Sequence, residues 1–254
     1  GEIIKVKEAM VTAQDLKDLL SMNCNEVELE KFATTHELDT AVSLSGLRFR
    51  ANFYKTIKGP ACVCRRVESK IPEMDQFSLP ESLYDIVDFH KGLVLVTGPT
   101  GSGKSTTLAA IVNEINKTRT ANIITVEDPV EFIHTDNQSI ISHREVGKQT
   151  QSFAAALKAA LREDPDVILV GEMRDLETIG LALTAAETGH LVFGTLHTSG
   201  APSTINRIID VFPPEQQEQI RAQISTSLKM VVTQRLLKTK DGQGRVGAFE
   251  IMKC

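Results

Sequence analysis

One segment of the sequence has the residue types and the spacing that bind phosphate groups. Its residues are Gly98, Pro99, Thr100, Gly101, Ser102, Gly103, Lys104, Ser105 and Thr106. They match the pattern Gly-x-x-x-x-Gly-Lys-Ser/Thr, in which glycines turn successive backbone N–H groups toward one anion. The positive N-terminus of the following helix faces the same anion. We expect Lys104 to reach the outer phosphates of a nucleotide and Ser105 to hold Mg²⁺.

Three further polar segments follow or flank apolar runs that read as strands. They are Glu127 to Glu131, Gly171 to Asp175, and His190 to His197. An open α/β sheet places its ligands at the carboxyl ends of its strands, so we expect these segments beside the phosphate loop. In-line attack of water on a terminal phosphate needs a carboxylate that orients the water and a cation that offsets the developing charge.

Glu172 is the first candidate for the water-orienting carboxylate. It follows the apolar run Val167 to Val170, although the usual pattern for such a site ends the strand in Asp. Glu172 therefore acts on the water, on Mg²⁺ through a water, or on both. Glu127 is the second candidate. His197 is either a structural residue or a sensor of the γ-phosphate, and Asp175 is expected to cap the next helix rather than to act in catalysis.

Arginines occur in strand-like runs nearer the N-terminus. Arg48 and Arg50 alternate with apolar residues, so they share the polar face of a half-buried strand. Arg65 and Arg66 lie in the next run. The pair on the polar face forms either a solvated stripe or, as arginine fingers do, a contact with a nucleotide held by a neighbouring subunit.

The elements that must position these residues fall into two groups, of which the first is a small α+β domain over residues 1–70. Thr12 and Asp15 predict a capped helix that runs to Leu20. Three strand-like runs separated by turns predict an antiparallel meander. These runs are 38–44, 47–56 and 61–67. Residues 71–80 are predicted to be a linker.

From residue 81 to 254 the pattern changes to apolar strands that alternate with helices. A short amphipathic helix is expected over 83–89. The expected strands are 93–96, 123–126, 167–170 and 191–196, and the expected helices between them are 104–116, 153–163 and 176–187. This alternation predicts an α/β domain whose parallel sheet is covered on both faces. The helical spacing of Ile220, Ile224, Leu228, Val231 and Val232 predicts a final helix over 215–237.

The composition of the 254 residues fits a two-domain globular chain and limits its partners. About 41% of the residues are apolar, which is enough for a sizeable core. A net charge of −5, no Trp and two Tyr argue against nucleic-acid binding through a basic channel with stacking aromatics. No window is apolar enough to span a membrane, and no signal peptide is visible.

The four cysteines are Cys24, Cys62, Cys64 and Cys254. Free thiols in a reducing compartment are their expected state. Cys62 and Cys64 are expected to share one face of a strand rather than to bind a metal ion.

Four segments resemble, in order, the motifs of the secretion ATPase superfamily. Gly92 to Thr107 resembles its Walker A region, and Ile124 to Phe132 resembles its acidic Asp box. Arg162 to Asp175 resembles its Walker B segment, and Thr188 to Thr198 resembles its His box. The paired C-x-x-C motifs that are common in the assembly motors of the family are absent from this sequence, which favours the branch that retracts type IV pili.

This resemblance implies a hexameric ring in which ATP and Mg²⁺ lie between a PAS-like N-terminal domain and a RecA-like ATPase domain. It implies that Arg48, Arg50 and Arg66 contact the nucleotide and that Glu172 is the catalytic glutamate. It also implies ATP hydrolysis that drives pilus retraction and twitching motility. The partner would be a pilus platform protein, and the location the cytoplasmic face of the inner membrane. Two parts of the family pattern have no counterpart here, the first helix and strand and the C-terminal helical region, so we expect the chain to be a portion of a longer protein.

Three alternatives to a retraction motor stay open at this point. The first is an assembly or secretion ATPase of the same superfamily. The second is a RecA-like nucleic-acid translocase, which shares the phosphate loop. The third is a scaffold that binds ATP but barely hydrolyses it, and a measured turnover rate would separate that scaffold from a motor.

Overall fold

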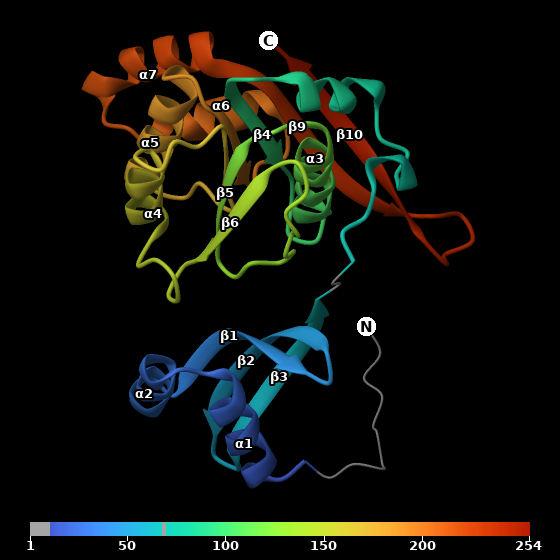
Figure 1. The fold of residues 1–254 in the computed structure, drawn as a ribbon, viewed down its shortest axis with the longest axis vertical. Coiled ribbons are helices and arrows are strands. Elements are labelled where there is room, and N and C mark those ends of the chain that lie inside the picture. Colours follow the sequence, from blue (N-terminus) through green and yellow to red (C-terminus); the bar gives the residue numbers. More distant parts are fainter. Residues whose placement is uncertain (1–10, 68–69) are drawn as a thin grey trace. The chain divides into compact units, whose positions relative to one another are not determined.

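The computed structural model describes residues 11–67 and 70–254, and the chain divides into two compact units, Gly1–Ser69 and Lys70–Cys254 (Figure 1). Residues 1–10 and 68–69, which belong to the predicted domain 1–70, lie outside the described residues. The predicted linker 71–80 contains a 3₁₀ helix, η1 (Met74–Gln76), whose Met74 is buried in a core of the second unit. This part of the linker is therefore packed structure of the larger unit.

In the small unit, two helices precede a three-stranded antiparallel sheet of order β1-β2-β3. Helix α1 (Ala13–Asn23) begins after Thr12, and Thr12 and Asp15 exchange hydrogen bonds, which confirms the predicted capping box. The predicted meander is also confirmed. Its strands are β1 (Glu37–Leu44), β2 (Leu47–Thr56) and β3 (Gly59–Val67).

Helix α2 (Glu26–Thr35) is absent from the prediction, although its start carries the same signal as that of α1. Asn25 and Glu28 form a second reciprocal capping box. Phe32 of this helix and Phe53 of β2 meet edge to face, with their ring centroids 6.4 Å apart. The helices therefore pack on one face of the small sheet.

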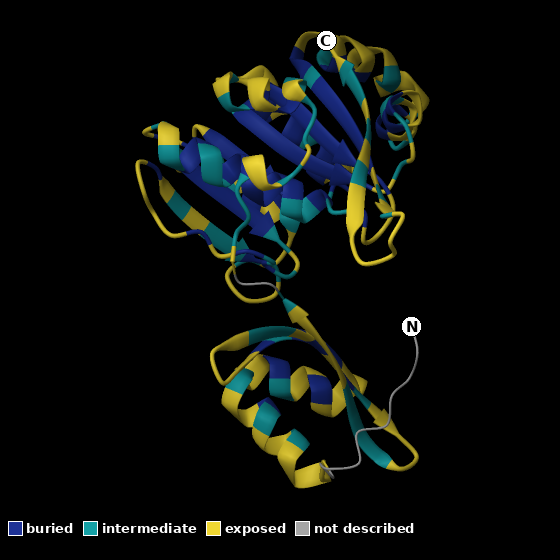
Figure 2. Ribbon diagram, turned by 90° about the vertical axis from the view of Figure 1, so that its right-hand side faces the viewer, coloured by how far each residue is buried: buried dark blue, intermediate teal, exposed yellow. Residues whose placement is uncertain are grey.

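The large unit is built on a seven-stranded sheet of order β10-β9-β4-β8-β7-β5-β6. All its strand pairs are parallel except β9 with β10. Every residue of β4, β7 and β8 is buried, as the dark blue strands of Figure 2 show, which explains their continuous apolar sequences. The strands are β4 (Gly92–Thr97), β5 (Asn122–Glu127), β6 (Ile140–Glu145), β7 (Val167–Val170), β8 (Leu191–Leu196), β9 (Leu228–Lys238) and β10 (Arg245–Lys253).

Helices cover both faces of this sheet, as predicted. Val94 packs with α3 and the 3₁₀ helix η2, whereas its neighbour Leu93 packs with α5, α6 and α7, so these groups lie on opposite faces. None of the helices in the described ranges is both long and apolar enough to cross a bilayer. The helices are η2 (Glu81–Asp88), α3 (Lys104–Thr118), α4 (Phe153–Ala160), α5 (Leu176–Glu187), α6 (Ala201–Asp210) and α7 (Pro214–Ser227).

The helix predicted over 215–237 is wrong in its second half. Helix α7 ends at Ser227, and β9 follows at once and lies in the sheet between β4 and β10. Val231 and Val232 are β-branched, which favours an extended strand, and both are fully buried. Hydrogen bonding of this segment to β4 and β10 stabilises the strand more than the helical spacing of its apolar residues favours a helix.

Two other predicted helices differ in type or length. The helix expected over 83–89 is the 3₁₀ helix η2. The helix expected over 153–163 ends earlier, at Ala160 of α4. After Ala160 the N–H groups of Arg162 and Glu163 bond to carbonyl oxygens only three residues back, so the chain tightens into turns.

Candidate active site

The predicted phosphate loop connects β4 to α3. Gly103 is the N-cap residue of α3 with a φ of 91°, and Gly98 has a φ of 137°. A Cβ atom at Gly103 would lie 2.8 Å from Nε2 of Gln234, and one at Gly98 would overlap the Gln234 carbonyl oxygen. Both positions accept only glycine, so the loop backbone has the shape that lets N–H groups approach an anion.

Lys104 lies at the start of α3 and is buried. Its Nζ donates hydrogen bonds to the carbonyl oxygens of Gly98, at 2.9 Å, and Pro99, at 3.2 Å. Burial lowers the pKa of Lys104, and the carboxylates of Glu172 and Glu131 partly offset that effect. The ammonium group is therefore already held at the loop, within reach of carboxylates.

Glu172 follows β7 and sits between two basic groups. Its Oε1 lies 2.5 Å from Nε of Arg174 and 3.1 Å from Nε2 of His197. Burial acts to raise the pKa of Glu172, but Arg174, His197 and Lys104 together outweigh it, so that pKa lies below its ordinary value. Glu172 is an ionised carboxylate at neutral pH.

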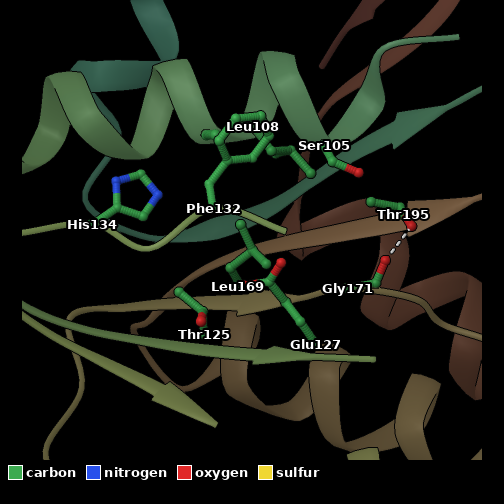
Figure 3. A pocket seen from close by; sticks show the side chains of 10 residues that line it. Ser105, Leu108, Thr125, Glu127, Phe132, His134, Leu169, Gly171 and Thr195 are labelled. Carbon is green, nitrogen blue, oxygen red and sulfur yellow. Dashed lines mark hydrogen bonds between the residues drawn. The ribbon is translucent and has the colours of Figure 1, made fainter. Parts of the chain in front are cut away.

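Glu127 ends β5 and lines a small cavity below α3. Figure 3 shows its side chain extending from the strand toward α3, where Ser105 lines the same cavity. The cavity measures about 30 Å³, which is room for about two water molecules. Burial raises the pKa of Glu127 to about 7, although hydrogen bonds from Thr125 and from the N–H of Glu131 lower it.

The two histidines that flank β8 lie at opposite ends of that strand. His197 meets Glu172 at the carboxyl end, whereas Nδ1 of His190 lies 2.9 Å from the carbonyl oxygen of Ala185 at the other end. Asp175 caps α5 by accepting a hydrogen bond from the N–H of Thr178, at 2.8 Å, which confirms that prediction. The carboxylate of Asp175 is therefore engaged at the start of α5.

The three arginines predicted to contact nucleotide do not share one face of the small sheet. Arg50 pairs in register with Arg65, and its Nη2 lies 2.7 Å from Oδ2 of Asp39. Arg48 lies on the same face as Arg50, because the two are separated by one residue of β2. Arg66 is opposite Phe49 and lies on the other face. The register between β2 and β3 determines which arginines share a face, and the sequence alone does not give that register.

Two residues that contact the candidate site are missing from the sequence prediction. Arg174 lies beside Glu172, and it belongs to the segment Arg162 to Asp175, in which the sequence assigns it no role. Gln234 packs against the phosphate loop, and the incorrect helix over 215–237 concealed it. The β-branched run from Val231 to Thr233, which directly precedes Gln234, is the sequence signal that indicates a strand here.

The family model of type II/IV secretion system proteins matches residues 36–252. The chain belongs to the type II/IV secretion system protein family. The matched region of this secretion system protein includes β1 to β3 and nearly all of the large unit.

Two curated relatives in the secretion system family cover nearly the whole chain. A twitching motility protein of Neisseria gonorrhoeae is 49% identical over 99% of this chain and 68% of its own length. The type IV pilus retraction ATPase PilT of Pseudomonas aeruginosa is 47% identical over 99% of this chain and 73% of its own length.

Solved structures of secretion system ATPases have the same fold. The pilus retraction motor PilT with bound ADP superposes with a TM-score of 0.89 at 48% identity, over 94% of this chain and 70% of that one. The Legionella pneumophila ATPase DotB has a TM-score of 0.89 at 30% identity, over 100% of this chain and 72% of its own. The predicted α/β class and the small N-terminal domain agree with these structures.

Proposed function

We propose that this chain is a Mg²⁺-dependent ATPase that powers type IV pilus retraction as a hexameric ring. The observation that carries the proposal is the convergence of Lys104, Ser105 and Glu172 at the carboxyl edge of the sheet. The identity of 47–49% to a retraction ATPase and a twitching motility protein supports retraction, rather than assembly, of the pilus.

The residues present fit a nucleoside triphosphate. Gly98 and Gly103 leave no room for a side chain on their β9 side, so the loop can present backbone N–H groups to phosphate oxygens. Lys104 would turn from the carbonyl oxygens that it now contacts toward the outer phosphates. Among the described residues the buried Ser102 hydroxyl has no hydrogen-bond partner, so this polar loop still has an unused donor. The PilT structure with bound ADP supports nucleotide binding by this family.

The same edge fits a magnesium ion. Ser105 offers a hydroxyl and Glu172 a carboxylate, which are oxygen ligands of the kind that Mg²⁺ prefers, directly or through water. Bound Mg²⁺ would supply positive charge that offsets the charge on the phosphates. Glu172 would hold the attacking water in line with the γ-phosphate, in the reaction ATP + H₂O → ADP + phosphate. His197 would keep the Glu172 carboxylate in place and contact the γ-phosphate.

Glu127 is the second candidate for the water-activating carboxylate. It shares the cavity with Ser105, and its pKa of about 7 suits a group that accepts a proton near neutral pH. Arg48 and Arg50, which share a face of the small sheet, would contact a nucleotide held by a neighbouring subunit, and Arg66 would do so from the other face. The platform protein of the pilus, at the cytoplasmic face of the inner membrane, would receive the motion.

An assembly ATPase is the second candidate function. The type IV pilus assembly ATPase PilB of Myxococcus xanthus is 39% identical over 75% of this chain. That identity is lower and covers less of the chain than the identity to PilT. We do not propose a nucleic-acid translocase.

The test measures Mg-ATP hydrolysis, nucleotide binding and oligomer size for the parent and for Glu172→Ala. The proposal expects a hydrolysing parent and a variant that still binds ATP but has lost turnover. A variant that keeps the parent rate would transfer the role to Glu127. A parent that binds ATP without turnover would leave a nucleotide-gated scaffold.

A further inference from the structure

Gln234 lies where β9 runs past the phosphate loop. The preceding residue, Thr233, pairs with Thr97 at the end of β4, and their hydroxyl oxygens are 3.0 Å apart. The β9 strand therefore continues beside the loop that follows Thr97, and Gln234 is only 4% exposed there. A buried side-chain amide needs hydrogen-bond partners, so its contacts indicate its role.

Gln234 contacts three parts of the loop and of the helix after it. Its Oε1 accepts a hydrogen bond from the Thr107 hydroxyl of α3, at 2.9 Å. Its Nε2 lies against Gly103, where an added Cβ would be 2.8 Å away. Its backbone carbonyl oxygen fills the space beside Gly98. One residue therefore touches both ends of the loop and the first turns of α3.

We infer that Gln234 is a positioning residue that holds the phosphate loop in its anion-binding shape and ties it to β9. The inference rests on the proposed nucleotide site. A loop held in its bound shape loses less conformational freedom when phosphate binds, so the affinity for nucleotide is higher. Gln234 does not itself touch the reacting atoms in this arrangement. Its loss should weaken nucleotide binding more than the chemical step.

The direction of the amide supports this role. Thr107 donates to Oε1, which leaves the two N–H groups of Nε2 on the side of Gly103. Leu236, two residues further along the same face of β9, also approaches Gly103, with its Cδ1 3.5 Å from the position of an added Cβ. The loop therefore rests on a polar group and an apolar group from one strand face.

The test compares Gln234→Leu, which keeps the size of the side chain but removes the amide, with the parent. The readouts are the Kd for Mg-ADP by calorimetry, KM and kcat for ATP, and Tm. We expect Kd and KM to rise about tenfold and kcat to change less than about threefold. Asn116→Ala is the matched control. Asn116, like Gln234, has a buried side-chain amide, but it lies near the C-terminal end of α3, far along the helix from the phosphate loop. It should lower Tm to a similar extent and leave Kd as in the parent.

A second pair of variants covers the case in which Gln234→Leu does not fold. Thr107→Val removes the donor with little change in shape and should raise KM, whereas Thr107→Ser keeps the hydroxyl and should restore the parent value. The inference is overturned if folded Gln234→Leu or Thr107→Val binds Mg-ADP as the parent does. Failure of the proposed function looks different, because then the parent itself would bind Mg-ADP no better than Lys104→Ala.

Discussion

Nε2 of His197 lies 3.1 Å from Oε1 of Glu172, so the first residue after β8 and the second residue after β7 form a pair at the ends of adjacent strands. Nε of Arg174 contacts the same oxygen of Glu172, at 2.5 Å. Two donors on one carboxylate oxygen fix the orientation of the carboxylate. The proposed reaction requires a fixed orientation of Glu172, because this residue aligns the attacking water.

The first prediction concerns this pair. His197→Ala should lower kcat for ATP about tenfold or more with little change in KM, because Glu172 loses one of its two positioning contacts. The measurement is a steady-state titration with ATP. His190→Ala is the control, since His190 lies at the other end of β8 and contacts the Ala185 carbonyl oxygen. Equal losses in both variants would show that His197 acts only through the stability of β8.

A second prediction uses the buried carboxyl group of Glu127. Its pKa in the folded protein is raised from 4.5 to about 7, so between these values the folded state binds more protons than the unfolded state. Stability should therefore fall as pH rises from about 4.5 to 7. Glu127→Gln should be more stable than the parent by up to about 3 kcal/mol at pH 8 and should show no advantage at pH 4. Urea unfolding without nucleotide or metal measures this, and an equal difference at both pH values would contradict it.

A third prediction concerns His134, which lines the same cavity and stacks on His143 with ring centroids 5.7 Å apart. Burial, and secondarily the charge on His143, lowers the pKa of His134 from 6.5 to about 4. Between these values the unfolded chain binds a proton that the folded protein does not, so stability should fall by up to about 3 kcal/mol as pH drops from 6.5 to 4.

The variant His134→Phe should lack this part of the acid sensitivity while keeping an aromatic ring in the cavity. The comparison is the free energy of unfolding at pH 4.5 and pH 7.5 for parent and variant. If both lose the same stability on acidification, another group is responsible.

A fourth prediction separates two neighbouring thiols. The sulfur atoms of Cys62 and Cys64 are 3.3 Å apart on one face of β3, and burial together with Cys64 raises the pKa of the Cys62 thiol to about 12. Iodoacetamide at pH 8 should therefore modify Cys64, which is exposed, well before Cys62. Peptide mapping at several times measures the order, and faster labelling of Cys62 would contradict the prediction.

Local sequence was sufficient for the parts of the site that one loop builds. The glycines and Lys104 are contiguous, and the capping role of Asp175 depends on a residue three positions away. The strand ends that carry Glu127 and Glu172 follow from continuous apolar runs. Each of these features can be predicted from residues that lie close together in the sequence.

The rest of the site depends on pairs that lie far apart in the chain. The spacing of Ile220, Ile224 and Leu228 continues a helical period into β9, and only β4 and β10 as neighbours make that segment a strand. The positions of Gln234 and of Arg66 depend on this pairing and on the β2–β3 register. The β-branched run before Gln234 indicates a strand, but no local pattern gives the neighbours of that strand or the register that places Arg66.

The hydroxyl contact between Thr97 and Thr233 spans 136 positions of the sequence. At a synthesis rate of about 5–20 residues per second, the strand that supports the phosphate loop leaves the ribosome roughly 7 to 27 s after the loop itself. During that interval the nascent chain carries the glycines and Lys104 without the strand that they pack against. Binding of ATP should therefore begin only after the ribosome has synthesised β9.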